Sequence, residues 1–211
     1  MQLAEQSYPV TDLAVAGPNL QTVEWIRRTG ARDVAEIGVY RGYTSRAIAE
    51  LLAGDGTLHL LDYTDRVVPV ADALRADGHR NVLSVPNSRR LLDSYNWSLM
   101  RLIEEHEEPI FDYVFLDGAH TWAFDALAFL LVDRLLRPGG HVDFDDYRWT
   151  LANSPSMRPE VFPDVQRLYS DEQIERAQVG LVVDLLVRRD PRYEEVCPDK
   201  VFRKCAAEAG G

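Results

Sequence analysis

Short apolar segments alternate along this chain with longer amphipathic ones, and this alternation limits the fold more than any other feature. In the longer segments, apolar residues recur with the spacing of a helix. Strands that alternate with helices form a parallel sheet covered by helices on both faces, which predicts an α/β fold. The predicted strands are Val34–Ile37, Thr57–Leu61, Val82–Val85, Tyr113–Leu116 and His141–Phe144.

The amphipathic segments predict the helices and the ends of the fold. Residues 1–30 form an N-terminal helical segment, in which Pro18 suits the first helical position and Gly30 closes the helix. Residues 149–173 carry several prolines and little periodicity, so we expect an irregular, lid-like insertion. Tyr193–Val196 and Lys200–Lys204 predict a C-terminal β-hairpin. The other predicted helices are Ala47–Leu52, Val68–Ala76, Leu91–Ile103, Trp122–Leu136 and Ile174–Arg189.

Length and charge narrow the class of protein. The 211 residues fit one domain, 1–211, and the formal net charge is -11. Such a surface repels nucleic acid and anionic membrane, which argues against these partners. It does not exclude a small anionic molecule as substrate in a locally basic pocket. Met1–Asp12 lacks the basic and apolar regions of a signal peptide, and the apolar stretches are too short to cross a bilayer. With only two cysteines, a cytoplasmic location is expected, while a homo-oligomer is left open.

The predicted strands share one further feature, which is a polar residue at or just after the end. In an open α/β sheet, ligands bind outside the carboxyl ends of the strands. We therefore expect these polar residues to gather along one edge of the sheet. They are Glu36 with Gly38, Asp62, Asn87, Asp117, and the pair Asp145 and Asp146.

The loop after the first strand predicts a nucleotide-like ligand. Gly38 permits a sharp turn, Gly42 allows close approach of a ligand, and Asp62 at the next strand end suits two ribose hydroxyls. Dinucleotide binding requires G-x-G-x-x-G, but Glu36 occupies the first glycine position and would repel a pyrophosphate. S-adenosylmethionine (SAM) has no phosphate and carries positive charge, so an acid favours it.

Asp117, Asp145 and Asp146 follow adjacent strands and predict a cation site. Three close carboxylates repel one another unless a cation or protons lie between them. Oxygen ligands suit a hard ion such as Mg²⁺. The alternative is that Asp117 contacts only the methionine end of the cofactor or caps a helix, while Asp145 and Asp146 order a turn.

Residues 20–150 resemble class I SAM-dependent methyltransferases, through Glu36–Asp62 and the run at residues 136–140. The resemblance implies a Rossmann-like, seven-stranded, mostly parallel sheet with helices on both faces and a C-terminal hairpin. It also implies that Asn87 and Ser88 lie near the adenine, although the pair could instead cap the next helix. The cofactor-binding residues that we expect are Glu36, Gly38, Gly42, Asp62, Asn87, Ser88 and Asp117.

The acids after the fourth and fifth strands are similar to those of cation-dependent O-methyltransferases of the catechol and macrolide-sugar types. That resemblance implies Asp117, Asp145 and Asp146 as metal ligands and His120 as general base, with Asp117 also catalytic. Mg²⁺ would bind two neighbouring acceptor oxygens and lower the pKa of one hydroxyl, and His120 would take its proton. The alternatives are a metal-free N- or O-methyltransferase, a non-catalytic SAM-binding module, and an NAD-linked oxidoreductase.

Overall fold

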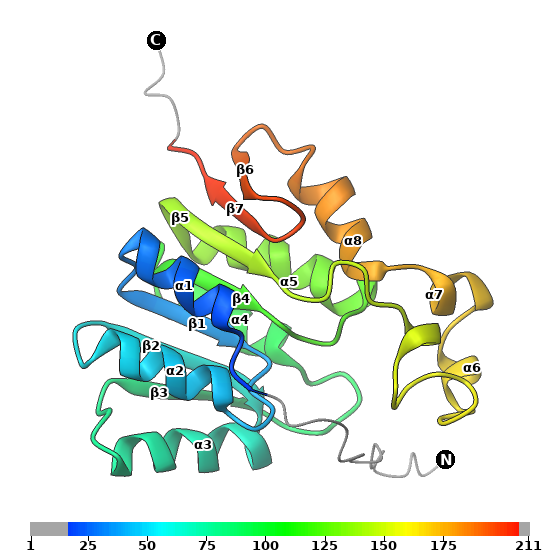
Figure 1. Cartoon of the computed structure of the whole chain (residues 1–211), viewed down its shortest axis with the longest axis horizontal. Helices are drawn as coiled ribbons and strands as arrows, with labels where there is room; N and C mark the ends of the chain where they lie inside the picture. The colour runs from blue at the N-terminus through cyan, green and yellow to red at the C-terminus, as the bar shows by residue number, and fades with distance from the viewer. Residues whose placement is uncertain (1–16, 207–211) are drawn as a thin grey trace.

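A computed structural model of the chain describes residues 17–206, so the expectation about Met1–Asp12 lies outside the described residues. Seven strands in that range form one sheet in the order β3-β2-β1-β4-β5-β7-β6 (Figure 1). None of the helices in the described part of the chain is long and apolar enough to cross a membrane. The strands are β1 Asp33–Ile37, β2 Thr57–Tyr63, β3 Val82–Asn87, β4 Phe111–Leu116, β5 Leu136–Phe144, β6 Tyr193–Cys197 and β7 Val201–Lys204.

The pairing of the strands confirms the predicted fold class. Strands β1 to β5 pair in parallel, and β7 joins β5 and β6 in antiparallel fashion as the C-terminal hairpin. The chain order reverses at β1, which lies between β2 and β4. In open α/β sheets, such a switch point opens the crevice in which ligands bind. The fold therefore favours a site at the carboxyl ends of β1, β2 and β4.

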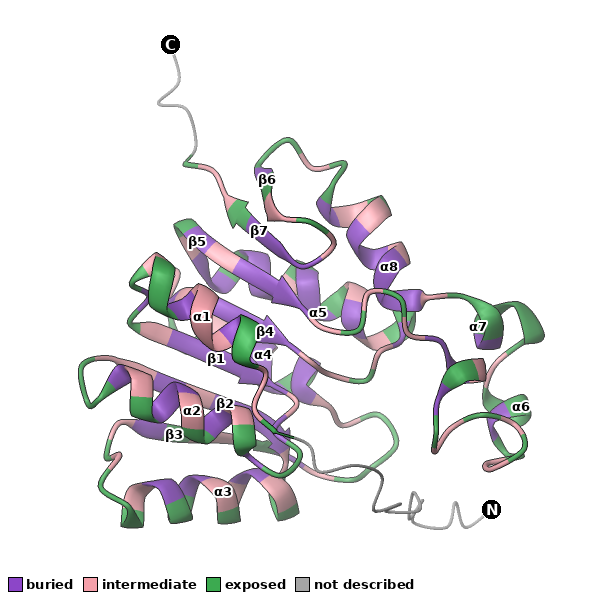
Figure 2. Cartoon of the chain, viewed as in Figure 1, coloured by how far each residue is buried: buried purple, intermediate pink, exposed green. Residues whose placement is uncertain are grey.

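Helices cover both faces of the sheet, as predicted. One apolar core lies between the sheet and helices α1 to α3, and the other lies between the sheet and helices α4, α5 and α8. Figure 2 shows the central strands β1 and β4 mostly buried and the outer helix faces exposed. The helices of the two faces are α1 Leu20–Thr29, α2 Tyr43–Leu52, α3 Thr64–Ala76, α4 Tyr95–Glu105, α5 Trp122–Leu135 and α8 Gln178–Val182.

Two helices start later in the chain than predicted. Helix α4 starts at Tyr95 rather than Leu91, because the Ser94 side chain caps the Asn96 N–H. Leu92 is 87% exposed and lies outside the core that its periodicity suggested. Helix α1 starts after Pro18, where the Asn19 side chain accepts from the Thr22 N–H. In both places a capping side chain fixes the start of the helix more firmly than the apolar pattern does.

The segment after β5 is irregular, as predicted, but it has a small core of its own. It contains a 3₁₀ turn, Leu151–Asn153, and helix α6, Val165–Leu168, and it extends beyond the carboxyl ends of the parallel strands (Figure 1). The predicted helix Ile174–Arg189 is interrupted at Arg176, which separates α7, Asp171–Glu175, from α8. A π-helical turn, Val183–Val187, then continues α8.

The run at residues 136–140 that carries part of the resemblance belongs to β5, which begins at Leu136. Leu136 already pairs with Phe111 of β4, and the register shifts before His141 pairs with Tyr113. Because Leu136 is buried at this pairing, the strand begins as soon as α5 ends. Gly139 and Gly140 therefore lie where the pairing of β5 with β4 shifts register.

Candidate active site at the carboxyl edge of the sheet

The loop between β1 and α2 lies against the end of β4, and Gly38 makes this contact possible. Gly38 has a φ of +92°, and an added Cβ would lie 1.8 Å from the Asp117 carbonyl oxygen. Gly42 caps α2 with a φ of +75°, and its Cβ would meet Val70 at 2.5 Å. The structure therefore gives both glycines a packing reason, in addition to the cofactor role that we predicted for them.

Glu36 is buried beneath this loop. Its carboxyl accepts a 2.5 Å hydrogen bond from the Ser45 hydroxyl at the start of α2. Burial raises the pKa of Glu36 to about 8; the Ser45 hydrogen bond opposes this rise and the nearby Asp62 adds to it. At neutral pH this raised pKa favours the protonated form of Glu36 in the free protein. A positively charged ligand nearby would lower the pKa and favour the ionised carboxylate.

Replacing Glu36 with glutamine is expected to stabilise the free protein at pH 8 by on the order of 2–4 kcal/mol, and hardly at all at pH 4.5. The pKa of Glu36 is about 8 in the folded chain, against an ordinary value of 4.5 for a glutamate side chain. The folded state therefore binds the extra proton, and stability falls as pH rises through this window. Urea unfolding at both pH values measures the effect, with the exposed Glu160→Gln as control. A pH-independent difference would contradict it.

Asp62 lies at the end of β2, as predicted, and is buried with its carboxylate facing the same loop. Its Oδ2 accepts from the backbone N–H groups of Val39 and Tyr40, at 2.9 and 3.0 Å, and its Oδ1 accepts from the Tyr63 N–H. Asp62 thus orders the loop that a cofactor would contact. Since each carboxylate oxygen has two lone pairs, Oδ2 is fully used and Oδ1 keeps one lone pair, which suits one ribose hydroxyl.

Asn87 is the last residue of β3 and Ser88 follows it, and neither caps a helix. The Ser88 N–H and hydroxyl both donate to Asp93, and the cap of α4 is Ser94, so the helix-cap alternative was wrong. The Asn87 side chain is buried, and its Oδ1 has no hydrogen-bond partner among the described residues. A buried acceptor without a partner costs free energy unless a ligand donates to it.

Asp117, His120 and Asp146 come together where β4 and β5 end. His120 Nε2 lies 3.6 Å from Asp117 Oδ1, and His120 Nδ1 lies 3.2 Å from Asp146 Oδ2. One ligand atom from each of the three residues lies within 4.8 Å of the others. Burial raises the pKa of Asp117 well above its ordinary value, and repulsion from Asp145 and Asp146 adds to the rise. The cluster therefore favours a proton or a cation.

Asp145 is near this cluster but contacts other groups. Its Oδ1 accepts from Asn19 Nδ2 at 3.3 Å and lies 3.7 Å from the Lys200 ammonium. Among the described residues, Asp145 does not belong to the group of mutually close ligand atoms. The structure thus brings two of the three predicted metal ligands together with His120, and pairs the third with the N-terminal helix and the hairpin.

Three residues at this edge were missed by the sequence reasoning: Asn19, Thr22 and Lys200. The Lys200 ammonium lies 2.8 Å from Asp143 Oδ1, and Asp143 is fully buried. Asp143 Oδ2 also accepts from the hydroxyls of Thr22 and Tyr113, each at 2.7 Å. Asp143, which had no predicted role, therefore ties α1 and the hairpin to the sheet directly behind Asp145. A charged residue within a buried strand was the one signal that could have indicated such a partner.

Comparisons with known proteins agree with this geometry. Residues 35–147 match a family model described as a methyltransferase domain, and this match covers more than half of the chain. No relative was found among curated proteins. An O-methyltransferase from Bacillus cereus in complex with SAH has a similar structure, with 19% identity and a TM-score of 0.57, over 94% of this chain and 84% of that one.

A second similar structure is the O-methyltransferase TomG from Streptomyces achromogenes, involved in tomaymycin synthesis and solved with SAM. It shares 26% identity and a TM-score of 0.53, over 74% of this chain and 70% of that one. The strand order and the site at its switch point define a class I SAM-dependent methyltransferase. The chain belongs to the methyltransferase domain family, and it is an enzyme of the methyltransferase type.

Proposed function

We propose that this enzyme transfers a methyl group from SAM to a hydroxyl of a small-molecule acceptor, assisted by Mg²⁺, with His120 as general base. The observation that carries the proposal is the placement of the His120 ring between Asp117 and Asp146. The likeness to TomG, named for tomaymycin synthesis, supports an acceptor from natural product biosynthesis. The net charge of -11 disfavours a nucleic-acid acceptor.

The cofactor position is supported by the polar residues that end β1, β2 and β3. The unpartnered Asn87 Oδ1 suits the adenine amino group as a donor. Asp62 Oδ1 has acceptor capacity for one ribose hydroxyl. Glu36 suits the positive charge of SAM. These roles place the adenosine along the loop between β1 and α2. The SAM methyl group would then lie toward Asp117, whose carbonyl contacts this loop at Gly38.

A divalent cation fits the residues at the ends of β4 and β5. Asp117, Asp145 and Asp146 offer the oxygen ligands that Mg²⁺ prefers. Burial first, and repulsion from Asp145 and Asp146 second, raise the pKa of Asp117, and a bound cation would offset both effects. When bound, Mg²⁺ supplies Lewis acidity that lowers the pKa of an acceptor hydroxyl. For Asp145 to join, its carboxylate would share its contacts with Asn19 and Lys200.

His120 is placed to move the proton. Asp146 Oδ2 lies 3.2 Å from Nδ1, which has no hydrogen-bond partner among the described residues. If Asp146 turns to accept a proton from Nδ1, Nε2 is left to take the proton of the substrate hydroxyl. The ring of Trp149 lies 5.1 Å from the His120 ring, so the segment after β5 reaches the base directly. Deprotonation by a positioned base contributes about 10²- to 10⁴-fold to such rates. The remaining contribution comes from holding the acceptor oxygen in line with the SAM methyl group.

One observation favours a second candidate, a metal-free N- or O-methyltransferase on the same fold. The Lys200 ammonium already lies 2.8 Å from Asp143 and 3.7 Å from Asp145. A resident cation of this kind offsets part of the acidic charge that a metal would otherwise neutralise. In this candidate His120 acts as base alone, and the acceptor is an amine or an isolated hydroxyl.

Calorimetric titration of Mg²⁺ and Mn²⁺ into protein saturated with S-adenosylhomocysteine tests the proposal. We expect one site, weakened at least tenfold by Asp145→Asn and retained in His120→Ala. The exposed Asp164→Asn is the matched control and should bind as the unmodified protein does. If His120→Ala abolishes binding while Asp145→Asn does not, His120 is a ligand rather than a base. If no variant binds the cations but all bind S-adenosylhomocysteine, the metal-free candidate is correct.

A further inference from the structure

The loop that carries His120 has an unfavourable backbone conformation. This loop, residues 118–121, joins β4 to α5, and His120 itself has a φ of +56°. Left-handed backbone costs free energy for a residue with a Cβ, so surrounding contacts must hold it in place. Since the orientation of the His120 ring depends on this backbone, those contacts also determine where the ring points.

Tyr95 and Asp125 hold the residues on both sides of His120. The Ala119 N–H donates to the Tyr95 hydroxyl at 3.1 Å, and that hydroxyl donates to Asp125 Oδ1 at 2.5 Å. The Thr121 N–H donates to Asp125 Oδ2 at 2.9 Å. The Asp125 carboxylate therefore holds the backbone on both sides of His120. It holds the residue before His120 through the Tyr95 hydroxyl and the residue after His120 by a direct hydrogen bond.

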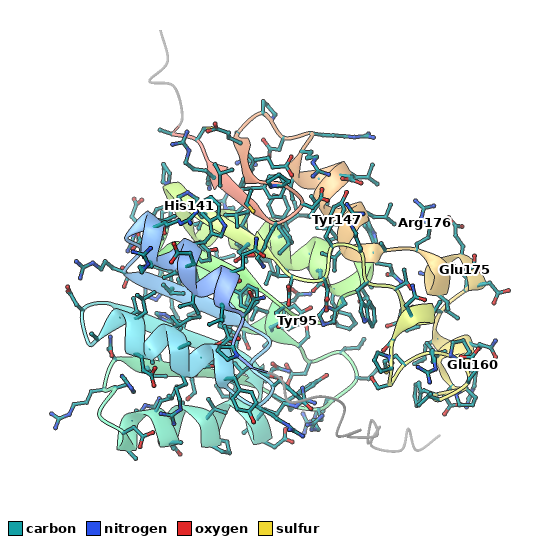
Figure 3. All side chains as sticks on the ribbon, in the orientation of Figure 1. Tyr95, His141, Tyr147, Glu160, Glu175 and Arg176 are labelled. Atoms are coloured by element: carbon teal, nitrogen blue, oxygen red, sulfur yellow. The ribbon has the colours of Figure 1, made fainter. Side chains whose placement is uncertain are left out.

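The surroundings of this pair are tightly packed. Asp125 is completely buried and Tyr95 is 9% exposed. A Cβ on Gly118 would lie 2.7 Å from the Tyr95 hydroxyl oxygen and 2.9 Å from Asp125 Oδ1, so the loop lies directly on the pair. Figure 3 labels Tyr95 at the carboxyl side of the sheet. The Trp122 N–H adds a third anchor, to Gln178 Oε1 of α8 at 2.8 Å.

We propose that Tyr95 and Asp125 are positioning residues that hold the 118–121 backbone so that the His120 ring faces Asp117 and Asp146. Their effect on turnover rests on the proposed function, in which His120 is the base, whereas their effect on the loop does not. Both residues hydrogen-bond backbone groups beside His120, and Asp125 also interacts electrostatically with His120. Tyr95→Phe is the cleanest change, because it removes one hydroxyl and leaves the ring that packs in the core.

Amide hydrogen exchange, followed by NMR without any acceptor, tests the effect on the loop. In Tyr95→Phe, the Ala119 amide loses its acceptor and its exchange should accelerate at least tenfold relative to amides in β4. The matched control is Tyr193→Phe, because the Tyr193 hydroxyl donates to Asp133 at the other end of the same helix, at 2.8 Å. This control should leave the Ala119 exchange rate unchanged. An unchanged rate in Tyr95→Phe, or equal acceleration in both variants, would overturn the proposal.

A double-mutant cycle then separates positioning from general stability. With a catechol as acceptor, Tyr95→Phe should lower kcat roughly tenfold while the KM for SAM stays the same. In the His120→Ala background, the same change should lower kcat no further, because the residue that it positions is gone. Equal losses in both backgrounds would show a purely structural role. If His120→Ala alone leaves kcat unchanged, His120 is not the base. The exchange experiment still shows whether Tyr95 and Asp125 hold the 118–121 backbone.

Discussion

Replacing His120 with alanine is expected to lower kcat for methyl transfer about 10²- to 10⁴-fold, the loss typical of a positioned general base. The KM for SAM should change little, because His120 lies beside the acids of β4 and β5 rather than the residues that end β2 and β3. The formation of S-adenosylhomocysteine from SAM and a panel of catechols and sugar diols measures the rate. Every acceptor in the panel carries two adjacent oxygens, as the proposed metal-assisted mechanism requires.

Two controls make this result specific to a base. His106→Ala removes an exposed histidine at the end of α4 and should leave kcat unchanged. Imidazole added to His120→Ala should restore part of the rate, because a small free base can occupy the space that the ring leaves. A rate that is unaffected by the His120 change would contradict the assignment. A loss that imidazole cannot restore, together with lost cation binding, would make His120 a metal ligand.

The polar strand ends were the most informative part of the sequence, because one rule of parallel sheets brings them together. Asp62, Asn87, Asp117 and Asp146 each follow a strand that periodicity locates well, and the register of the sheet aligns these strands at one edge. No knowledge of side-chain contacts was needed for this. The fold class could be predicted on the same grounds, since alternating strands and helices leave few arrangements.

The contacts of individual side chains could not be predicted in this way. Asp145 and Asp146 are adjacent in sequence, but Asp146 has a φ of +57° and faces His120, while Asp145 faces Asn19 and Lys200. A strand end gives the position of a carboxylate but not its direction, which depends on backbone turns and on partners far away in the chain. Lys200 is such a partner, because only the hairpin topology places it beside β5.

Local capping also limits what periodicity can predict. Leu91 and Leu92 continue the apolar spacing of α4 toward its N-terminus, yet both are exposed, because the cap at Ser94 starts the helix later. The loop between β3 and α4 is instead ordered by Asp93, which accepts from Ser88. A short polar side chain thus outweighs two leucines in setting this boundary.

Replacing Lys200 with methionine is expected to destabilise the protein by about 3–5 kcal/mol, the cost of removing one partner of a buried ion pair. Asp143 is completely buried, and its Oδ1 faces the Lys200 ammonium at 2.8 Å. Without that ammonium, Asp143 keeps the hydroxyls of Thr22 and Tyr113 as donors but has no compensating charge. Urea unfolding at pH 7 measures the loss. The comparison variant is Lys204→Met, which removes a second hairpin lysine; that lysine pairs with Asp133, and this ion pair is less buried.

The double variant Lys200→Met with Asp143→Asn decides whether charge is the cause. An asparagine is neutral and can still accept a hydrogen bond from Thr22 or Tyr113, so most of the stability should return. If the double variant is as unstable as Lys200→Met alone, the loss comes from packing of the lysine stem rather than from an uncompensated carboxylate. The same pair of variants bears on the site, because Lys200 lies 3.7 Å from Asp145. If stability returns in the double variant while cation binding stays altered, Lys200 acts on Asp145 separately from its role in the core.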